Sequence, residues 1–97
     1  MKPHQFHPEA DEEYARAAQD YAAVSTELGG RFYDEIERVI AEIAKAPHRF
    51  RAYEPPARRY LANGFPFAVV YLDEPDLVWI LAVMPLRRHP DYWKHRL

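Results

Sequence analysis

Residues 58–84 read RRYLANGFPFAVVYLDEPDLVWILAVM, and this stretch decides the fold. Its apolar segments are Arg58–Ala62, Phe65–Leu72 and Leu77–Met84, separated by Asn63-Gly64 and by Asp73–Asp76. Short runs rich in β-branched and aromatic residues and bounded by turn residues are typical of strands. Asn-Gly favours a type I′ hairpin, in which both residues have positive φ angles, and Pro75 suits a type I turn. The stretch therefore predicts a three-stranded antiparallel meander.

Both faces of this predicted sheet are apolar. A sheet covered on one face alternates apolar and polar residues, whereas the second and third segments do not. Strict alternation would place Phe65, Phe67, Val69 and Tyr71 opposite Ala68, Val70 and Leu72, and Leu77, Trp79, Leu81 and Val83 opposite Val78, Ile80, Ala82 and Met84. The face that helices leave open must be covered by the chain's own tail, by a second copy or by a partner. We expect a partner groove, because one extended tail is short for a whole sheet face.

The first half of the chain predicts two antiparallel helices after an extended start at Pro3–Phe6. Apolar residues recur at helical spacing in two stripes, Ala10, Tyr14, Ala17, Tyr21 and Val24, then Leu28, Phe32, Ile36, Val39 and Ile43. Pro8 suits a first helical turn, Ser25 or Thr26 suits a cap between the helices, and Pro47 ends the second helix. Gly29-Gly30 indicates fraying or a later start of that helix.

These elements give an α+β fold in a single domain, residues 1–97, in the order strand, helical hairpin and three-stranded meander. A chain of 97 residues with 48% apolar and 29% charged residues is neither disordered nor divided into several domains. It has no cysteine, which excludes disulfides and a thiol nucleophile. Neither a membrane-spanning run nor a signal peptide is recognisable, so we expect a cytoplasmic protein without a membrane partner.

The sequence contains no cofactor motif, and we expect neither cofactor nor metal. The five histidines include no pair at i, i+4 spacing beside a carboxylate. Glu12-Glu13 lies in an acidic first helical turn, where solvated charge is the default, so a catalytic carboxylate pair is rejected.

The basic residues gather in the second half of the chain. Residues 1–48 hold five Lys or Arg and ten Asp or Glu, a net charge of −5, whereas residues 49–97 hold eight and five, a net charge of +3. Guanidinium groups bind phosphate or carboxylate with two parallel hydrogen bonds, and aromatic rings stack on bases. The candidates for a target-binding surface are Arg58, Arg59, Arg87, Arg88, Tyr92, Trp93, Lys94 and Arg96. The alternative is that Tyr92 and Trp93 anchor the tail to the sheet while the cations are solvated.

Arg58 and Arg59 are adjacent in a strand, so their side chains point to opposite faces and only one can line an open groove.

Six short motifs follow one another between about residue 3 and residue 96. They are His7-Pro8-Glu9-Ala10, Leu28-Gly29-Gly30-Arg31-Phe32, Pro47-His48-Arg49-Phe50, Arg58-Arg59-Tyr60-Leu61, Phe65-Pro66-Phe67 with Val70-Tyr71, and Arg87-Arg88-His89-Pro90-Asp91-Tyr92-Trp93. Their order and spacing resemble the RelE/ParE superfamily of toxins from bacterial type II toxin–antitoxin systems, with the ParE-like branch the nearer one.

The resemblance implies a cognate antitoxin, encoded alongside, whose acidic C-terminal segment wraps the toxin in a hetero-oligomer. The second apolar sheet face and the positive second half fit such a partner. We expect its contacts at Phe67, Val69, Tyr71, Trp79 and Leu81.

The resemblance also separates two activities. RelE-type members cut mRNA on the ribosome with basic residues on the sheet, an arginine inside the middle meander strand, and a tail tyrosine or histidine. Arg59, Arg87, Arg88 and Tyr92 are the candidates for such catalytic roles, but the middle-strand position is Ala68. ParE-type members instead bind DNA gyrase. We therefore expect a non-enzymatic gyrase inhibitor, and the alternatives are a ribosome-dependent mRNA endoribonuclease and a non-toxic partner-binding module.

Overall fold

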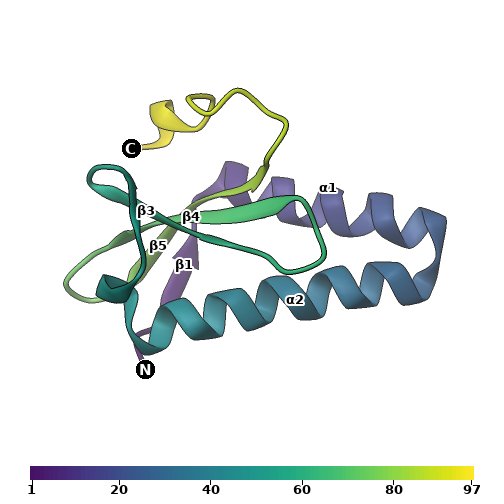
Figure 1. The fold of residues 1–97 in the computed structure, drawn as a ribbon, viewed down its shortest axis with the longest axis horizontal. Helices are drawn as coiled ribbons and strands as arrows, with labels where there is room; N and C mark the ends of the chain where they lie inside the picture. Colours follow the sequence, from purple (N-terminus) through teal and green to yellow (C-terminus); the bar gives the residue numbers. More distant parts are fainter.

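The computed structural model describes residues 1–97 and confirms the α+β architecture, with a strand, a helical hairpin and a meander in one sheet (Figure 1). The elements are β1 (His4–Phe6), α1 (Pro8–Val24), α2 (Thr26–Lys45), β2 (Ala52–Glu54), β3 (Ala57–Leu61), β4 (Phe67–Asp73) and β5 (Val78–Pro85), with 3-10 turns η1 (Pro47–Arg49) and η2 (Lys94–Arg96). The sheet order is β1-β5-β4-β3-β2, in which β1 runs parallel to β5 and the other pairs are antiparallel. The short edge strand β2 was not predicted. None of the helices combines the length and apolar character that crossing a membrane requires.

The helix ends follow the expected local chemistry. His7 Nδ1 accepts a hydrogen bond from the Glu9 backbone N–H at 3.0 Å, and proline occupies the first turn of α1. Ser25 caps α2, because its Oγ accepts from the Leu28 N–H at 3.0 Å. Helix α2 ends at Lys45, shortly before Pro47.

Gly29 lets the two helices approach closely. A Cβ added there would lie 2.7 Å from Ala22 Cβ and 2.8 Å from Ala22 Cα, whereas one added at Gly30 would meet nothing within 4 Å. The expectation of fraying or a later helix start is wrong, since α2 begins at Thr26 and Gly29 is a buried helix–helix contact.

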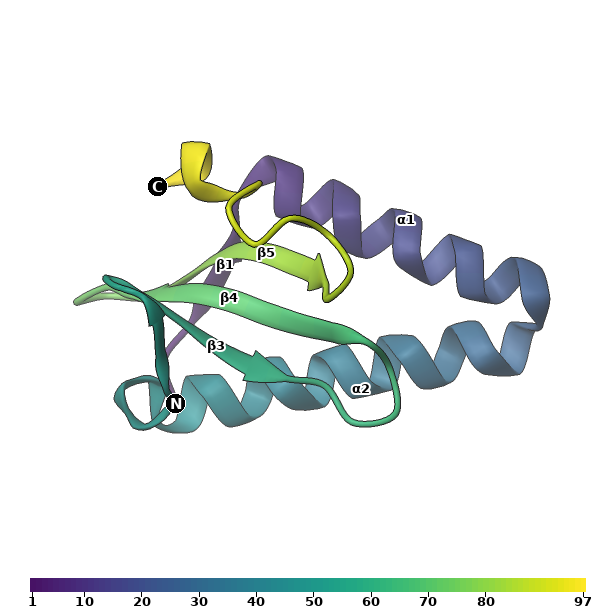
Figure 2. The same cartoon turned by 45° about the horizontal axis from the view of Figure 1, so that its top comes forward.

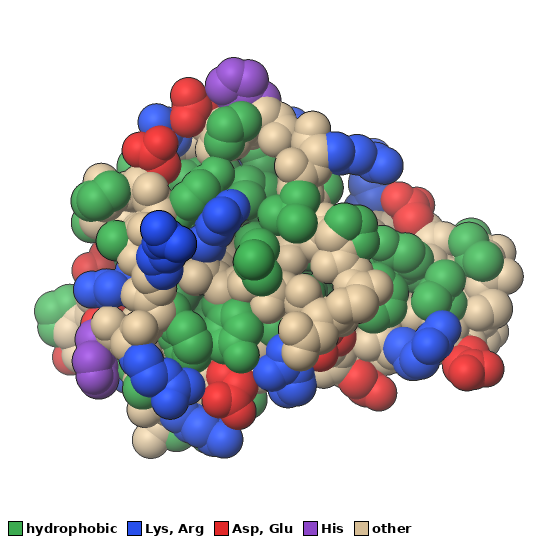
Figure 3. Space-filling model, in the orientation of Figure 1, with side chains coloured by type: hydrophobic (Ala, Val, Ile, Leu, Met, Phe, Trp, Pro, Cys, Tyr) green, Lys and Arg blue, Asp and Glu red, His purple; other side chains and the backbone are tan.

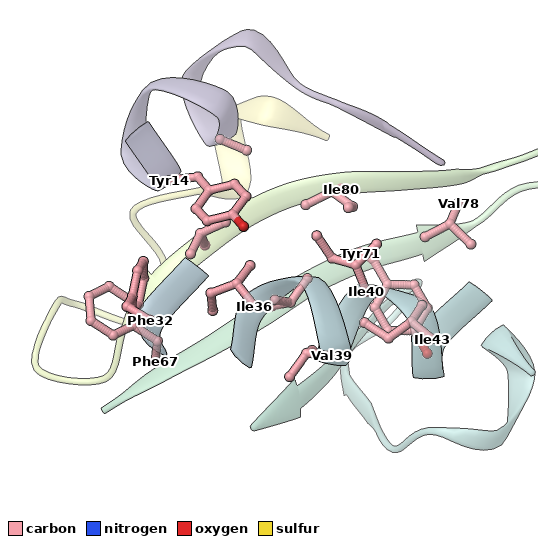
Figure 4. Close-up of a cluster of buried hydrophobic side chains, with 13 residues drawn as sticks. Tyr14, Phe32, Ile36, Val39, Ile40, Ile43, Phe67, Tyr71, Val78 and Ile80 are labelled. Atoms are coloured by element: carbon pink, nitrogen blue, oxygen red, sulfur yellow. The ribbon is translucent and has the colours of Figure 1, made fainter. Parts of the chain in front are cut away.

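The hairpin α1–α2 covers one face of the sheet over a cluster of 13 buried residues (Figure 4). Phe32 stands at the centre of its aromatic part, with ring centroids 5.0–6.2 Å from those of Tyr14, Tyr21, Phe65 and Phe67. Towards the other end, the Tyr71 hydroxyl donates to the Pro47 carbonyl. Burial raises the pKa of Tyr71 to about 12.

The tail, residues 86–97, covers the other face. Figure 2 shows it folding back over the end of β5 towards the start of α1. Its Trp93 is fully buried on six sheet residues, Ala57, Ala68, Val70, Leu81, Ala82 and Met84. Of the three covers that the sequence left open, the structure contains the first, the chain's own tail. We expected one tail to be too short to cover this face. That expectation is wrong for the part of the face beneath Trp93.

A β-bulge breaks the predicted alternation in β5. Val70 pairs with Ala82 but Tyr71 pairs with Ile80, so Leu81 is an extra residue on β5. As a result Leu81 and Ala82 both belong to the tail-covered cluster, while Ile80 and Val83 belong to the helix-covered one. The strict two-face division of this strand is therefore wrong beyond Leu81.

The connection between β3 and β4 also differs from the prediction. Gly64 has φ 76°, but no non-glycine residue has a positive φ, so Asn63-Gly64 is not a type I′ turn. The strands end at Leu61 and resume at Phe67, and the Asn63 N–H donates to Glu35 Oε2 at 2.6 Å. The loop is thus tied to α2 rather than closed as a two-residue hairpin.

Candidate functional site

Arg96 fastens the tail to α1. Its Nη1 lies 2.8 Å from Glu13 Oε1 and 3.0 Å from the Leu81 carbonyl oxygen, and its Nε lies 3.1 Å from Glu9 Oε2. The Arg96 side chain is only 6% exposed and that of Glu13 16%. Burial alone would lower the pKa of Arg96, but hydrogen bonds to Glu13 and the attraction of both carboxylates raise it. We call Glu9, Glu13 and Arg96 the clasp.

His95 adds an exposed contact to the clasp. Its Nε2 lies 2.7 Å from Glu9 Oε2, and this hydrogen bond lowers the pKa of Glu9 below its ordinary value. The neighbouring Lys94 pairs with Asp91 at 3.0 Å and with Glu54 of β2 at 3.7 Å.

Two aromatic side chains complete the contact of the tail. Trp93 Nε1 is buried without a hydrogen-bond partner, and Tyr92 Oη is buried next to Glu13. The Tyr92 ring lies between the guanidinium groups of Arg88, at 4.1 Å, and Arg96, at 5.1 Å. Burial, with the neighbouring charge of Glu13, raises the pKa of Tyr92 above its ordinary value.

A cleft of about 450 Å³ opens between α1 and the end of β5. Its apolar lining includes Ala17, Tyr21, Val24, Phe67 and Val83, and its basic residues are Arg16, Arg87 and Arg88. Glu13 and Asp20 are its acidic residues, and Glu13 is already paired with Arg96. The uncompensated charge of the cleft is therefore positive, around an apolar lining.

The backbone edge of β5 beside this cleft is already blocked. Strand β1 pairs with β5 only as far as Ile80, which leaves residues 81–85 without a strand neighbour on that side. The Leu81 carbonyl accepts from Arg96, the Val83 N–H donates to Glu13 Oε1 at 3.1 Å, and Pro85 has no N–H. Charged side chains and proline on an edge prevent the addition of another strand. An occupant of the cleft must therefore bind mainly through side chains.

Comparison with known proteins places these features in a family. The family model described as "ParE toxin of type II toxin-antitoxin system, parDE" matches residues 5–90. The chain belongs to the ParE toxin family. A solved chain described as "Chromosomal ParDE TA system from P. aeruginosa" has the same fold, with a TM-score of 0.78 and 14% sequence identity, over 90% of this chain and 98% of that one. No curated protein matches the sequence.

The toxin does not gather its predicted target-binding residues on one surface. Arg58 lies on the helix-covered side and donates to the Phe50 carbonyl at 2.7 Å, whereas Arg59 lies on the opposite side, 4.3 Å over the Tyr53 ring. This confirms that the two arginines point to opposite faces. Arg87 and Arg88 line the cleft, and Lys94 is exposed. Tyr92, Trp93 and Arg96 turn inward, as the anchoring alternative for the two aromatic residues predicted.

The expected antitoxin contacts of the toxin need a larger correction. Phe67, Val69 and Tyr71 lie in the helix-covered core, and Leu81 lies in the cluster beneath the tail, each at most 8% exposed. Of the five, Trp79 alone is partly exposed, at the rim of the tail-covered cluster. The reasons are that the helices cover the face of Phe67, Val69 and Tyr71, and that the register of β5 places Trp79 and Leu81 on the opposite, tail-covered face.

Sequence reasoning missed the acidic half of the clasp. Glu13 was assigned to a solvated first turn, yet it binds Arg96 across 83 positions of the sequence. The available signal was the pair Glu9 and Glu13, which lie on one helix face four residues apart, with several cations near the C-terminus. No three His, Asp or Glu side chains lie close enough together to hold a metal ion.

Proposed function

We propose that this ParE-family toxin stops growth in the cytoplasm by binding DNA gyrase, without cutting RNA, until a cognate antitoxin neutralises it. The observation that carries the non-enzymatic part is the environment of Ala68. This residue occupies the middle-strand position where the ribonuclease pattern has an arginine, and it is fully buried in one cluster with Trp93. Because alanine has no charged group, this position supplies no cation to a phosphate whether the tail is docked or open.

The tail tyrosine is equally unsuited to ribonuclease chemistry. A general base near a 2′-hydroxyl must accept a proton close to neutral pH. The ordinary pKa of a tyrosine hydroxyl is 10.0, far above neutral pH, and burial raises that of Tyr92 further while the tail is docked, so the hydroxyl stays protonated. The remaining ribonuclease candidates are divided, since Arg59 stacks on Tyr53 while Arg87 and Arg88 line the cleft. The arrangement supports binding through surface cations rather than acid–base catalysis.

The cleft between α1 and β5 is our candidate for the antitoxin contact. Its apolar lining and its Arg16, Arg87 and Arg88 fit an amphipathic segment that carries acidic side chains. Because the β5 edge is blocked, that segment would insert apolar side chains rather than add a strand. This assignment replaces the buried residues of the helix-covered core as the expected antitoxin surface.

Expression of the toxin alone tests the proposed activity. We expect growth arrest, and we expect the purified protein to inhibit supercoiling by gyrase while translated messages stay intact in primer extension. Growth arrest with normal supercoiling would reject gyrase as the target. Discrete cuts in translated messages would favour the endoribonuclease, and harmless expression would favour the non-toxic binding module.

Charge reversal tests the antitoxin site. The probe is the protein encoded by the adjacent reading frame, purified together with the toxin. Arg87→Glu with Arg88→Glu should weaken that complex by about tenfold or more, because both cations line the cleft. Arg31→Glu, an exposed cation of α2 outside the cleft, is the matched control and should leave the affinity unchanged. Equal affinities for both variants would rule out the cleft.

A further inference from the structure

Beyond a backbone attachment at its first residues, the tail is held to the rest of the molecule by its side chains. The Leu86 N–H donates to the Pro66 carbonyl at 2.9 Å, and this is the last backbone hydrogen bond between the tail and another loop or strand. The later ones are local, Arg88 to Pro85, Tyr92 to His89, Lys94 to Asp91, Arg96 to Trp93 and Leu97 to Lys94. Apart from the turn between Arg88 and Pro85, residues 87–97 make no backbone hydrogen bond to a strand, to α1 or to α2, so they can leave the sheet without disrupting its ladders.

The fit of the tail is imperfect in its polar groups. Trp93 Nε1, which belongs to the tail, is a buried side-chain donor without a hydrogen-bond partner. An unpaired buried donor loses the hydrogen bond that it would have with water. Opening would return this N–H to water, which offsets part of the loss of the Trp93 contact.

The docked tail also hides residues that the proposed function needs. Tyr92, Trp93 and Arg96 are among the expected target contacts, yet the first two face the protein interior and Arg96 is held by Glu9 and Glu13. A basic aromatic segment can contact a target through these side chains only after the tail has left its seat.

We propose that residues 87–97 are a hinged cover that restrains the toxin, with a closed state held by the clasp and an open state that presents Tyr92, Trp93 and Arg96 to the target. The hinge lies at Pro85–Leu86, where the strand ends and the last backbone bond to the body is made. The existence of the open state does not depend on the target, whereas its role as the active state rests on the proposed function.

Tryptophan fluorescence measures the opening directly. The chain has two tryptophans, so Trp79→Phe leaves Trp93 as the only one. In this background we expect acrylamide to quench Trp93 weakly. Adding Glu13→Gln removes the charge that binds Arg96 and should raise the open population roughly tenfold or more, with stronger quenching. Glu9→Gln should have a smaller effect because Glu9 is more exposed.

Glu12→Gln is the matched control for these variants. Glu12 is the exposed neighbour of Glu13 on α1, and its replacement should leave the quenching of Trp93 unchanged. Circular dichroism reports whether the sheet stays folded. Unchanged quenching in both the Glu9 and Glu13 variants would overturn the proposal, and so would quenching that rises only as the whole protein unfolds.

Inhibition of gyrase supercoiling tests separately whether the open state exists and whether it is the active state. If the open form is the active one, Glu13→Gln should inhibit at a concentration lower by about the factor by which its open population rises, roughly tenfold. Stronger quenching of Trp93 without stronger inhibition of gyrase would overturn the proposal that the docked tail restrains the toxin. Stronger quenching when neither the original protein nor the variant inhibits gyrase would reject gyrase as the target and leave the hinged cover in place.

Discussion

The two faces of the sheet are equally apolar but are covered in different ways. Helices of 17 and 20 residues cover one face over 13 buried residues, and each helix is joined to the chain at both ends. The tail covers the other face over a cluster of seven residues that includes Trp93, and beyond the turn at Arg88 its backbone makes no hydrogen bond to the sheet or to α1 and α2. Hydrophobicity therefore requires that a face be covered, whereas the bonds that attach the cover decide whether it can open separately.

The helix-covered face should respond most strongly to substitution. Phe32→Ala removes a fully buried ring that touches four other aromatic rings, and we expect a loss of ~3–5 kcal/mol in the free energy of unfolding. Chemical denaturation measures this loss. A loss below ~1 kcal/mol would mean that the hairpin is not an integral part of the fold.

The close approach of α1 and α2 gives a second test of the helix-covered face. Gly29→Ala places a methyl group within 2.8 Å of the Ala22 backbone, so the helices must separate at a cost of ~1–3 kcal/mol. Gly30→Ala is the matched control, because the added Cβ meets nothing and alanine favours the helix by ~0.5–1 kcal/mol. We expect Gly29→Ala to lower and Gly30→Ala to raise the midpoint of thermal unfolding. If both substitutions raise it, the close contact between Gly29 and Ala22 is contradicted.

Trp93→Ala should cost less than Phe32→Ala, although tryptophan is the larger side chain and is equally buried. The loss in the free energy of unfolding cannot exceed the free energy by which the tail is docked, because the substitution has no effect on the protein once the tail is detached. We expect a loss of ~1–2 kcal/mol in global unfolding. A loss equal to or larger than that of Phe32→Ala would show that the tail is part of the cooperative core.

The smallest effect is a pH dependence of the clasp. The pKa of Glu9 is lowered from 4.5 in the folded state by the hydrogen bond with His95. A lowered folded-state pKa gives a contribution that is present above 4.5 and is lost as the pH falls through the folded-state value. Acrylamide quenching of Trp93 should therefore begin to rise as the pH falls below about 4.5, and Glu9→Gln should remove this rise. If the rise persists in Glu9→Gln, titrating groups other than Glu9 cause it.

Particular residues show what the sequence could predict. The helical stripes, the Ser25 cap and the three apolar strands follow from short-range patterns, and all are present in the structure. The bulge at Leu81 was not predictable, because an apolar run continues through it with no break in composition. Gly29 was read as a weak helix former because its role depends on a contact with Ala22 in the other helix.

The site was predictable only in part. The cations of the tail were identified, and the inward position of Trp93 was foreseen as an alternative. The clasp was missed, since it joins Glu13 to a residue 83 positions away and local acidity suggests a solvated turn. The expected antitoxin contacts were misplaced because alternation defines two faces without saying which one the helices cover.

Native-state hydrogen exchange across low denaturant concentrations tests most directly whether the two faces have different covers. We predict that the hydrogen-bonded amides of Tyr92, Lys94 and Arg96 exchange through an opening of low free energy and weak denaturant dependence, while amides of β4 and β5 exchange only with global unfolding. Tail amides that exchange with the same free energy and denaturant dependence as β4 and β5 would contradict the account.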